Sequence, residues 1–328
     1  MSIADARTLS IIHWLNHTLK LEIKHFEPAS SDASFRRYFR VIYNQGQQIV
    51  MDAPPERENI KPFICIAELL KKSGLNVPEI YQKNLTQGFL LLEDFGCSCY
   101  LDQLNESTAE DLYLSAFNSL YKLQSNTTDS NCPLPQYNAD LLNKELSIFY
   151  QWFIQQYLNL SIPEQLQDSL NLLLISSALA QPQVVVHRDF HSRNLMVLAE
   201  NSPGIIDFQD AVMGPISYDL VSLLKDCYIS WPEHQVEHWM TVFFQQTTTS
   251  GLIDVDIETF TRWFDLMGLQ RHLKAIGIFA RLHLRDNKSD YLTDIPRTMN
   301  YVTQVCRKYP ELTEFNEFLT HTILPAYK

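Results

Sequence analysis

Three short apolar segments interrupt a stretch of sequence that otherwise favours helices, and polar residues lie at their ends. The segments are residues 184–187, 195–198 and 204–207. Each is too short for a helix, and its Val, Ile and Leu residues are typical of a buried strand. Asp189 and Asn194 lie in the turn between the first two segments, and Asp207 ends the third. A hairpin of the second and third segments would bring Asn194 and Asp207 together.

These three polar side chains suit phosphoryl transfer from a nucleotide. The reaction needs a carboxylate that orients the attacking hydroxyl and accepts its proton, and hard oxygen ligands that hold Mg²⁺ against the phosphates. Asp189 fits the first role, and the amide oxygen of Asn194 and the carboxylate of Asp207 fit the second. Asp189 and Asn194 are close enough in sequence for one short loop to direct both at the same point.

The rest of the 328-residue chain separates into a sheet-containing first part and a mostly helical remainder. In the first part we expect a helix at 2–20, a hairpin at 35–43 and 48–52, a helix at 62–73, and strands at 76–81 and 88–92. Beyond it we expect helices at 107–124, 140–158, 164–179, 216–228, 233–250, 256–286, 292–308 and 311–322. The boundary falls near residues 93–96.

Charge and hydropathy exclude several classes of protein. Asp and Glu number 38 against 26 Lys and Arg, which gives a net charge of −12. A nucleic-acid binder needs a basic face, so we expect no nucleic-acid partner. No apolar run is long enough to span a bilayer, and the N-terminus lacks the continuous apolar core of a signal peptide. We therefore expect a cytoplasmic protein with no membrane partner.

The pattern His187-x-Asp189-x-x-x-x-Asn194, followed by Ile206-Asp207-Phe208, resembles the aminoglycoside phosphotransferase and choline kinase-like family, relatives of the protein kinases. The resemblance implies an α+β, bilobal protein-kinase-like fold that uses ATP and Mg²⁺. Residues 1–93 would form the nucleotide-binding lobe, and residues 94–328 the catalytic and substrate-binding lobe. In such relatives the residue matching Asp219 braces the catalytic loop, and we expect His187 to hydrogen-bond to the loop backbone.

More narrowly, several segments are similar to bacterial anomeric N-acetylmuramate/N-acetylglucosamine kinases. They are residues 31–38, 50–55, 91–96, 186–189, 207–211 and 267–272. This similarity implies ATP-dependent phosphorylation of an amino sugar at its anomeric hydroxyl, in the recycling of cell-wall peptidoglycan.

The nucleotide site departs from the family pattern. Relatives place a Lys on the strand after the first hairpin to hold the phosphates, whereas residues 48–52 contain no Lys and Asp52 occupies roughly that place. Because guanidinium groups bind phosphate bidentately, arginines of the first hairpin are the candidates to replace that Lys. We expect cofactor contacts from Ser34, in place of a glycine-rich loop, from Arg36, Arg37 or Arg40, and from Glu93 and Phe95 at the hinge between lobes.

The long helix expected at 256–286 carries a basic stripe of Arg271, Lys274, Arg281 and Arg285. Such a stripe suits an anionic sugar such as N-acetylmuramate, which bears a lactyl carboxylate, better than a polycationic aminoglycoside. Candidate acceptor residues are His191, Asp265, Gln270 and Arg271, because a pocket with a few polar groups suits a sugar.

Three alternatives remain open. The acceptor could be an aminoglycoside, choline or another amino alcohol. The missing Lys admits a non-catalytic nucleotide-binding module. His187 and His191, with Asp189 between them, admit a metal hydrolase, although no helix carries the pair.

Overall fold

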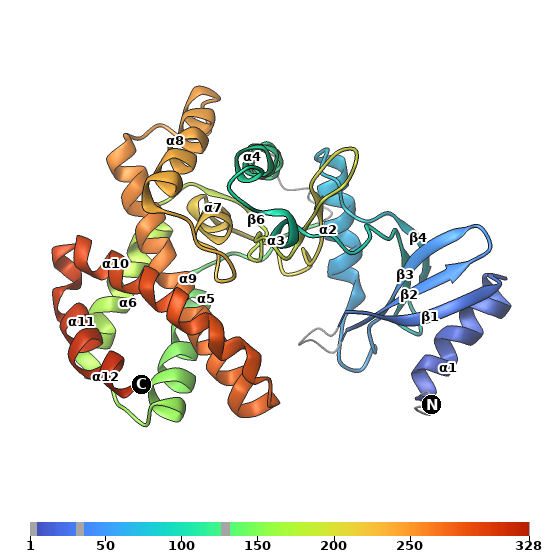
Figure 1. The fold of residues 1–328 in the computed structure, drawn as a ribbon, viewed down its shortest axis with the longest axis horizontal. Helices are drawn as coiled ribbons and strands as arrows, with labels where there is room; N and C mark the ends of the chain where they lie inside the picture. The colour runs from blue at the N-terminus through green and yellow to red at the C-terminus, as the bar shows by residue number, and fades with distance from the viewer. Residues whose placement is uncertain (1–4, 31–35, 126–131, 328) are drawn as a thin grey trace. The chain divides into compact units, whose positions relative to one another are not determined.

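The structure is a computed structural model that describes residues 5–30, 36–125 and 132–327 (Figure 1). Its contacts divide the chain into two compact units. The first comprises Met1–Ser98 and Met196–Gln209, and the second comprises Cys99–Leu195 and Asp210–Lys328. The boundary expected at residues 93 and 94 lies close to the first division. The inclusion of residues 196–209 in the first unit is a feature that the sequence expectation did not contain.

An antiparallel five-stranded sheet forms the centre of the first unit. Its order is β1 (Ile23–Ser30), β2 (Arg37–Tyr43), β3 (Gly46–Asp52), β5 (Phe89–Leu92) and β4 (Ile80–Asn84). The hairpin predicted from sequence is confirmed as β2 and β3, which pair from Arg37 opposite Asp52 to Tyr43 opposite Gly46. Strand β1 was not predicted. It lies at the sheet edge, where the missing N–H of Pro28 is tolerated, and its pairing is interrupted near Pro28.

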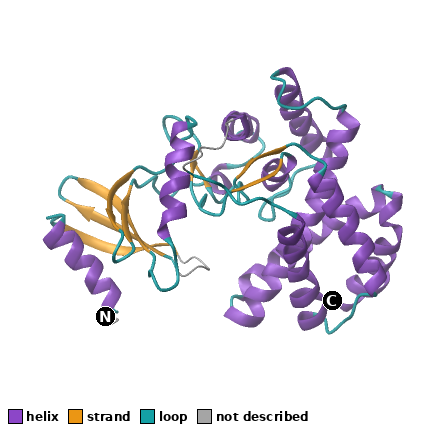
Figure 2. Ribbon diagram, turned by 180° about the vertical axis from the view of Figure 1, so that it is seen from behind, coloured by secondary structure: helices purple, strands orange, loops and turns teal. Residues whose placement is uncertain are grey.

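An N-terminal helix covers part of this sheet. It runs through α1 (Ala6–His13) and the π-helical turn η1 (Trp14–Thr18), and begins at Asp5, whose carboxylate accepts the N–H of Thr8. Ile11, Trp14 and Leu15 are buried with sheet residues including Val41 and Val50. The predicted N-terminal helix is therefore confirmed as an element docked on the sheet (Figure 2).

The segment 196–209 joins the first unit through backbone and aromatic contacts. Its strand β8 (Gly204–Ile205) pairs with β7 (Leu195–Met196), and the N–H of Ile205 donates to the carbonyl of Asn76 at 2.8 Å. A Cβ at Gly204 would lie 2.6 Å from the Phe95 ring, so glycine permits this close approach. The buried Phe208 ring packs against Phe63 of α2 (Ile60–Lys72), with centroids 4.9 Å apart.

The second unit is mostly helical. Its elements are α3 (Tyr100–Gln103), α4 (Ala109–Ser125), α5 (Ala139–Ile148), η2 (Phe149–Tyr157), α6 (Glu164–Leu179), β6 (Gln183–Val186), β9 (Val212–Pro215), α7 (Ser217–Leu224), α8 (Glu233–Thr249), α9 (Ile257–Asp286), η3 (Ser289–Asp294), α10 (Ile295–Lys308), η4 (Pro310–Leu312), α11 (Thr313–Phe318), η5 (Leu319–Ile323) and α12 (Leu324–Ala326). Strand β6 pairs with β9 in a small antiparallel ribbon. The expected helices are present, and β9 was not predicted. No helix within the described ranges is long and apolar enough to cross a membrane.

Helix α9 is the central element of this unit and packs against α5, η2, α6, α7 and α10. It begins at Asp256, which accepts the N–H of Thr259, and ends at Asn287 in the left-handed conformation. Gly277 lets α9 approach the junction of α5 and η2, because a Cβ there would lie 2.6 Å from the backbone of Ile148 and Phe149.

We expect Gly277→Ala to destabilise the protein by about 1–3 kcal/mol, because the added methyl group meets backbone atoms that cannot rotate away. The matched control is Gly268→Ala on the same helix, where the nearest side-chain atom would lie at an ordinary 3.5 Å. That change should be neutral or stabilising by up to about 1 kcal/mol. Urea unfolding of both variants measures the difference, and equal stabilities would contradict the close-packing argument.

Candidate active site

The loop 187–194 between β6 and β7 is held by two buried carboxylates. Asp219 of α7 accepts the backbone N–H of His187 at 2.6 Å and of Arg188 at 3.0 Å. Asp226, just beyond α7, accepts the N–H and the hydroxyl of Ser192 at 2.9 and 2.6 Å. Both carboxylates are fully buried. Burial raises the pKa of Asp219 to about 7, while its two N–H donors act in the opposite direction. The bracing role expected for Asp219 is therefore present, and Asp226 shares it.

Internal hydrogen bonds fix the conformation of the loop around Asp189. The carbonyl of Asp189 accepts the N–H of His191 and the side-chain amide of Asn194, each at 3.0 Å. The N–H of Asp189 donates to Nδ1 of His187 at 3.2 Å, which is the backbone contact expected for that histidine. Arg188 has a φ of 76°, a left-handed conformation that is costly for a non-glycine residue and is found mostly at functional sites.

The carboxylate of Asp189 is half-buried and available to a ligand. It forms no hydrogen bond or ion pair with any residue that the structure describes. Burial raises the pKa of Asp189, but the positive charge of Lys274, aided by His191, His187 and Arg188, outweighs that effect and lowers the pKa overall. An ionised carboxylate without an intramolecular partner can accept a hydrogen bond, and then a proton, from a substrate hydroxyl.

A buried ion cluster lies beside this loop. Glu145 of α5 pairs with Nη2 of Arg188 at 2.5 Å and with Nζ of Lys274 at 2.9 Å, and accepts the hydroxyl of Tyr137. Lys274 also contacts the hydroxyl of Tyr218 at 3.1 Å. Burial raises the pKa of Glu145, but the positive charges of Lys274 and Arg188 lower it by more. The pKa is therefore lowered overall, and the group is ionised. Because Arg188 precedes Asp189, this cluster ties the catalytic loop to α5 and α9.

The residues expected to bind the acceptor separate into two groups. His191 belongs to the loop, and Arg271 and Asp189 are close enough to influence one another electrostatically. Gln270 is fully buried and donates to the carbonyl of Leu142 in α5. Asp265 is paired with Lys225 and Lys308 at 2.9 and 2.7 Å. The structure thus brings His191 and Arg271 to the catalytic loop and gives Gln270 and Asp265 other partners within the fold.

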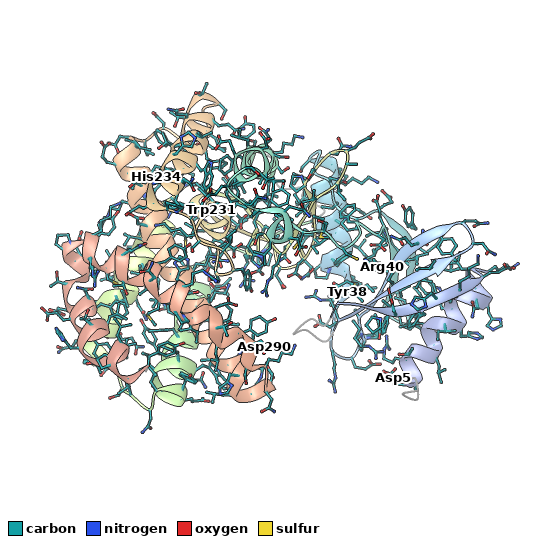
Figure 3. The ribbon with its side chains drawn as sticks, in the orientation of Figure 1. Asp5, Tyr38, Arg40, Trp231, His234 and Asp290 are labelled. Carbon is teal, nitrogen blue, oxygen red and sulfur yellow. The ribbon has the colours of Figure 1, made fainter. Side chains whose placement is uncertain are left out.

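Asp265 also lines a cavity of about 150 Å³ in the second unit. The other lining residues include Lys225, Phe264 and Lys308 as well as Trp231, which is labelled in Figure 3. The lining combines aromatic side chains with amides and charges of both signs.

In the first unit, the arginines of the expected nucleotide site have carboxylate partners. Asp52 is fully buried and accepts from Arg7 at 2.9 and 2.5 Å and from Arg37 at 2.9 and 2.6 Å. Arg37 also pairs with Asp5, labelled in Figure 3. Arg36 is half-buried just before β2, and Ser34 lies outside the described residues. Asp52, roughly where the family resemblance leads us to expect a Lys, is thus paired with two guanidinium groups.

The expected hinge contains a bidentate ion pair between Arg40 and Asp94. Arg40 of β2 bonds both carboxylate oxygens of Asp94, at 2.6 and 3.0 Å, and the carbonyl of Gly96 at 3.0 Å. The N–H of Glu93 donates to the carbonyl of Glu79 at 2.9 Å. Within the described part of the chain, the carbonyl of Glu93 and the N–H of Phe95 form no hydrogen bond. These two backbone groups are the ones that an adenine edge would use.

Asp207 is held in a left-handed conformation, with a φ of 64°. Its Oδ1 accepts the side-chain amide of Gln209 at 2.8 Å, and the neighbouring Phe208 is anchored in the first unit. Asn194 uses its amide nitrogen to hold the loop, where it donates to the carbonyl of Asp189. A carboxylate and an amide oxygen are the donor types that suit Mg²⁺.

The metal-hydrolase alternative has little geometric support. Nδ1 of His187 accepts a backbone N–H. Among the described residues, no group of three or more His, Cys, Asp and Glu side chains is placed to hold a metal ion.

Sequence reasoning did not assign roles to Asp226 or Glu145. The available signals were an acidic residue two positions after the apolar pair Leu223-Leu224 and a glutamate on the apolar face of a predicted helix. Neither signal indicates which residue is the partner, because the partners, Ser192 for Asp226 and Arg188 and Lys274 for Glu145, are distant in sequence.

Comparison with known proteins gives consistent results. Residues 25–252 match the model of a phosphotransferase enzyme family. An N-acetylmuramate/N-acetylglucosamine kinase of Pseudomonas putida is 45% identical over 295 residues, covering 89% of this chain and 86% of that protein. The corresponding kinase of Neisseria meningitidis is 37% identical over 326 residues, covering 97% and 96%.

Solved structures share the fold at low sequence identity. A choline kinase from Streptococcus pneumoniae matches with a TM-score of 0.66 at 15% identity, covering 91% of this chain and all of that one (100%). An ADP-bound aminoglycoside phosphotransferase matches with a TM-score of 0.61 at 16% identity, covering 92% and 99%. The α+β, protein-kinase-like fold expected from the sequence is confirmed.

We expect Glu145→Gln to destabilise the protein by about 3 kcal/mol, because Arg188 and Lys274 would lose their shared buried counter-ion. The control is Glu311→Gln, which breaks the exposed pair with Arg262 at 3.0 Å and should cost at most about 1 kcal/mol. Thermal and urea unfolding measure both. A Glu145 variant as stable as the control would show that the cluster contributes nothing to folding.

Proposed function

The chain belongs to the phosphotransferase enzyme family, and from this premise we propose that it transfers the γ-phosphoryl group of ATP to the anomeric hydroxyl of N-acetylmuramate or N-acetylglucosamine. The printed names of its relatives supply the acceptors. The observation that carries the proposal is the ionised Asp189 carboxylate, held on a braced loop without an intramolecular partner in the described chain. The cellular role would be the recycling of peptidoglycan sugars in the cytoplasm, where ATP is present.

In the proposed reaction, Asp189 accepts a hydrogen bond from the anomeric hydroxyl and orients its oxygen toward the γ-phosphorus. A bond forms between that oxygen and phosphorus while the bond from phosphorus to the β,γ-bridging oxygen breaks, so ADP leaves with the electron pair. The hydroxyl proton passes to Asp189, late in the step because the transition state is loose. The hydrogen bonds to the Asp189 backbone keep the carboxylate in position throughout.

Asn194 and Asp207 are the residues that we assign to Mg²⁺. When bound, the ion would offset the charge on the phosphate oxygens. Asp207 offers a carboxylate oxygen from a conformation fixed by the buried Phe208, and Asn194 offers its amide oxygen from the braced loop.

For the nucleotide we assign the backbone of Glu93 and Phe95 to the adenine edge, and Ser34, Arg36 and Arg37 to the phosphates. The unpaired carbonyl and N–H at the hinge, as the structure describes it, support the first assignment. Arg37 has two carboxylate partners, Asp5 and Asp52, which compete with phosphate for its guanidinium.

The test is an acceptor panel with purified protein, ATP and Mg²⁺: N-acetylmuramate, N-acetylglucosamine, kanamycin and choline. We expect ADP release with the two sugars only, and a product whose phosphate is lost in mild acid and whose reducing end is blocked, as for an anomeric phosphate. Turnover of kanamycin or choline instead would favour the other acceptors of the family. Nucleotide binding without any product would favour a non-catalytic module.

Asp189→Asn and Asp207→Asn should each reduce kcat by about 10²–10⁴-fold with a normal melting temperature, because each removes one charged oxygen group from the reaction. Initial rates of ADP release, measured across a Mg²⁺ titration, provide the readout. Glu311→Gln, on an exposed pair, serves as the control. Wild-type turnover in either Asp variant would refute the role assigned to that residue.

Lys274→Met should move the acidic limb of the kcat/KM profile to higher pH. Lys274 lowers the pKa of Asp189, so its removal raises that pKa and protonates the carboxylate at a pH where the wild type is still ionised. Arg285→Met, which alters an exposed residue of the same helix paired with Asp286, should leave the profile unchanged. An unshifted limb in the Lys274 variant would show that Asp189 does not determine it.

A further inference from the structure

The four cations of the stripe on α9 differ sharply in their surroundings. Lys274 is neutralised by Glu145, and the exposed Arg285 pairs with its neighbour Asp286. Arg281 is half-buried. Arg271 is 6% exposed, yet no carboxylate of the described chain lies within ion-pair distance of it. The expected basic stripe is therefore not one uniform surface, and Arg271 stands apart within it.

The hydrogen bonding of Arg271 is far from complete. Its only hydrogen bond in the described structure runs from Nη1 to Sγ of Cys227, a weak acceptor, at 3.5 Å. A guanidinium carries five N–H donors, so most of them have no protein partner. Among the described atoms, Nε of Arg188 and Nε of Arg281 are sealed from water without a partner, whereas no nitrogen of Arg271 is. The unused donors of Arg271 therefore reach accessible space.

Arg271 lies close to the loop 187–194, because its Nη1 contacts Sγ of Cys227, the residue after Asp226, whose carboxylate accepts from Ser192 of that loop. Its charge acts on Asp189 and Asp226, and it lowers the pKa of His191, which burial already lowers. His191 is therefore neutral, and its buried Nδ1 has no hydrogen-bond partner in the described residues. Asp226 does not form an ion pair with Arg271 in the described chain, and its oxygens accept from Ser192 and from the N–H of Tyr228. A nearly buried cation with open donors and a neutral histidine beside it suits an anionic oxygen group of a ligand.

We infer that Arg271 recognises the lactyl carboxylate of N-acetylmuramate, and so determines how the enzyme discriminates between its two amino sugars. This inference rests on the proposed function. The two sugars differ only in the lactyl ether, and a planar guanidinium can bind its carboxylate through two parallel hydrogen bonds. The chain has a net charge of −12, which disfavours an anionic substrate at long range, so a local cation is needed to bind it.

The test compares kcat/KM for both sugars in wild type, Arg271→Met and Arg271→Lys. Arg271→Met should lower the ratio of N-acetylmuramate to N-acetylglucosamine by about 10- to 100-fold, the usual range for a lost hydrogen bond to a charged group. Arg271→Lys should give an intermediate ratio, because lysine keeps the positive charge but cannot form the two parallel hydrogen bonds of a guanidinium. Activity with N-acetylglucosamine reports, within the same variant, that the fold and phosphoryl transfer are intact.

A neutral analogue of N-acetylmuramate tests whether Arg271 acts on the carboxylate itself. With the carboxamide analogue of N-acetylmuramate, the wild type should lose as much as Arg271→Met loses with the acid, and the variant should lose little more. Arg281→Met, farther along the same helix, should keep the wild-type ratio.

An unchanged ratio in Arg271→Met, or an equal loss for both sugars, would overturn the inference and leave Arg271 as a structural or phosphoryl-binding residue. Failure of the wild type to phosphorylate either sugar would instead refute the proposed function. The wild-type assay with the two sugars tests the proposed function before any Arg271 variant is made.

Discussion

The loop 187–194, which carries Asp189, depends on two carboxylates for its position. Asp219 and Asp226 are fully buried, and each would be costly there without donors. The backbone N–H groups of His187, Arg188 and Ser192 would be equally costly without acceptors. Each set satisfies the other, so the loop is fixed to α7 through Asp219 and to the segment just beyond α7 through Asp226. Because α7 packs against α9, the helical core positions the loop, while hydrogen bonds within the loop fix its conformation around Asp189.

The same core distributes charge around the loop unequally. Glu145 neutralises Arg188 and Lys274 together, and in doing so ties the residue before Asp189 to α5 and α9. No carboxylate of the described chain forms an ion pair with Arg271, and Asp226 accepts from Ser192. The result is one ionised carboxylate and one guanidinium, both without a full set of partners in the described chain and close enough to interact. In an enzyme, such incomplete groups are completed by substrate.

Sequence reasoning reached the parts of this arrangement that depend on local patterns. The helix 256–286, the β2–β3 hairpin and the spacing of Asp189, Asn194 and Asp207 follow from periodicity and motif. Strand β1 escaped because Pro28 and partial exposure break the strand pattern, and β9 because Gly214 and Pro215 read as a turn. The basic stripe was visible as spacing, but the pairing of Lys274 depends on Glu145 in another helix. No local pattern contains that information.

The missing lysine of β3 has a structural explanation in the first unit. Arg37 lies directly opposite Asp52 in the β2–β3 pairing, and Arg7 reaches the same carboxylate from α1. The buried carboxylate of Asp52 therefore links the N-terminal helix to the sheet through two partly exposed guanidinium groups, and Arg37 also pairs with Asp5. A lysine in place of Asp52 would stand against two arginines with no counter-ion, which is strongly repulsive away from water. The chain can thus carry either the docked arginines or a lysine at this position, but not both. Because it carries the arginines, the charge that steadies the nucleotide phosphates has to come from another source, such as Arg36 or backbone N–H groups.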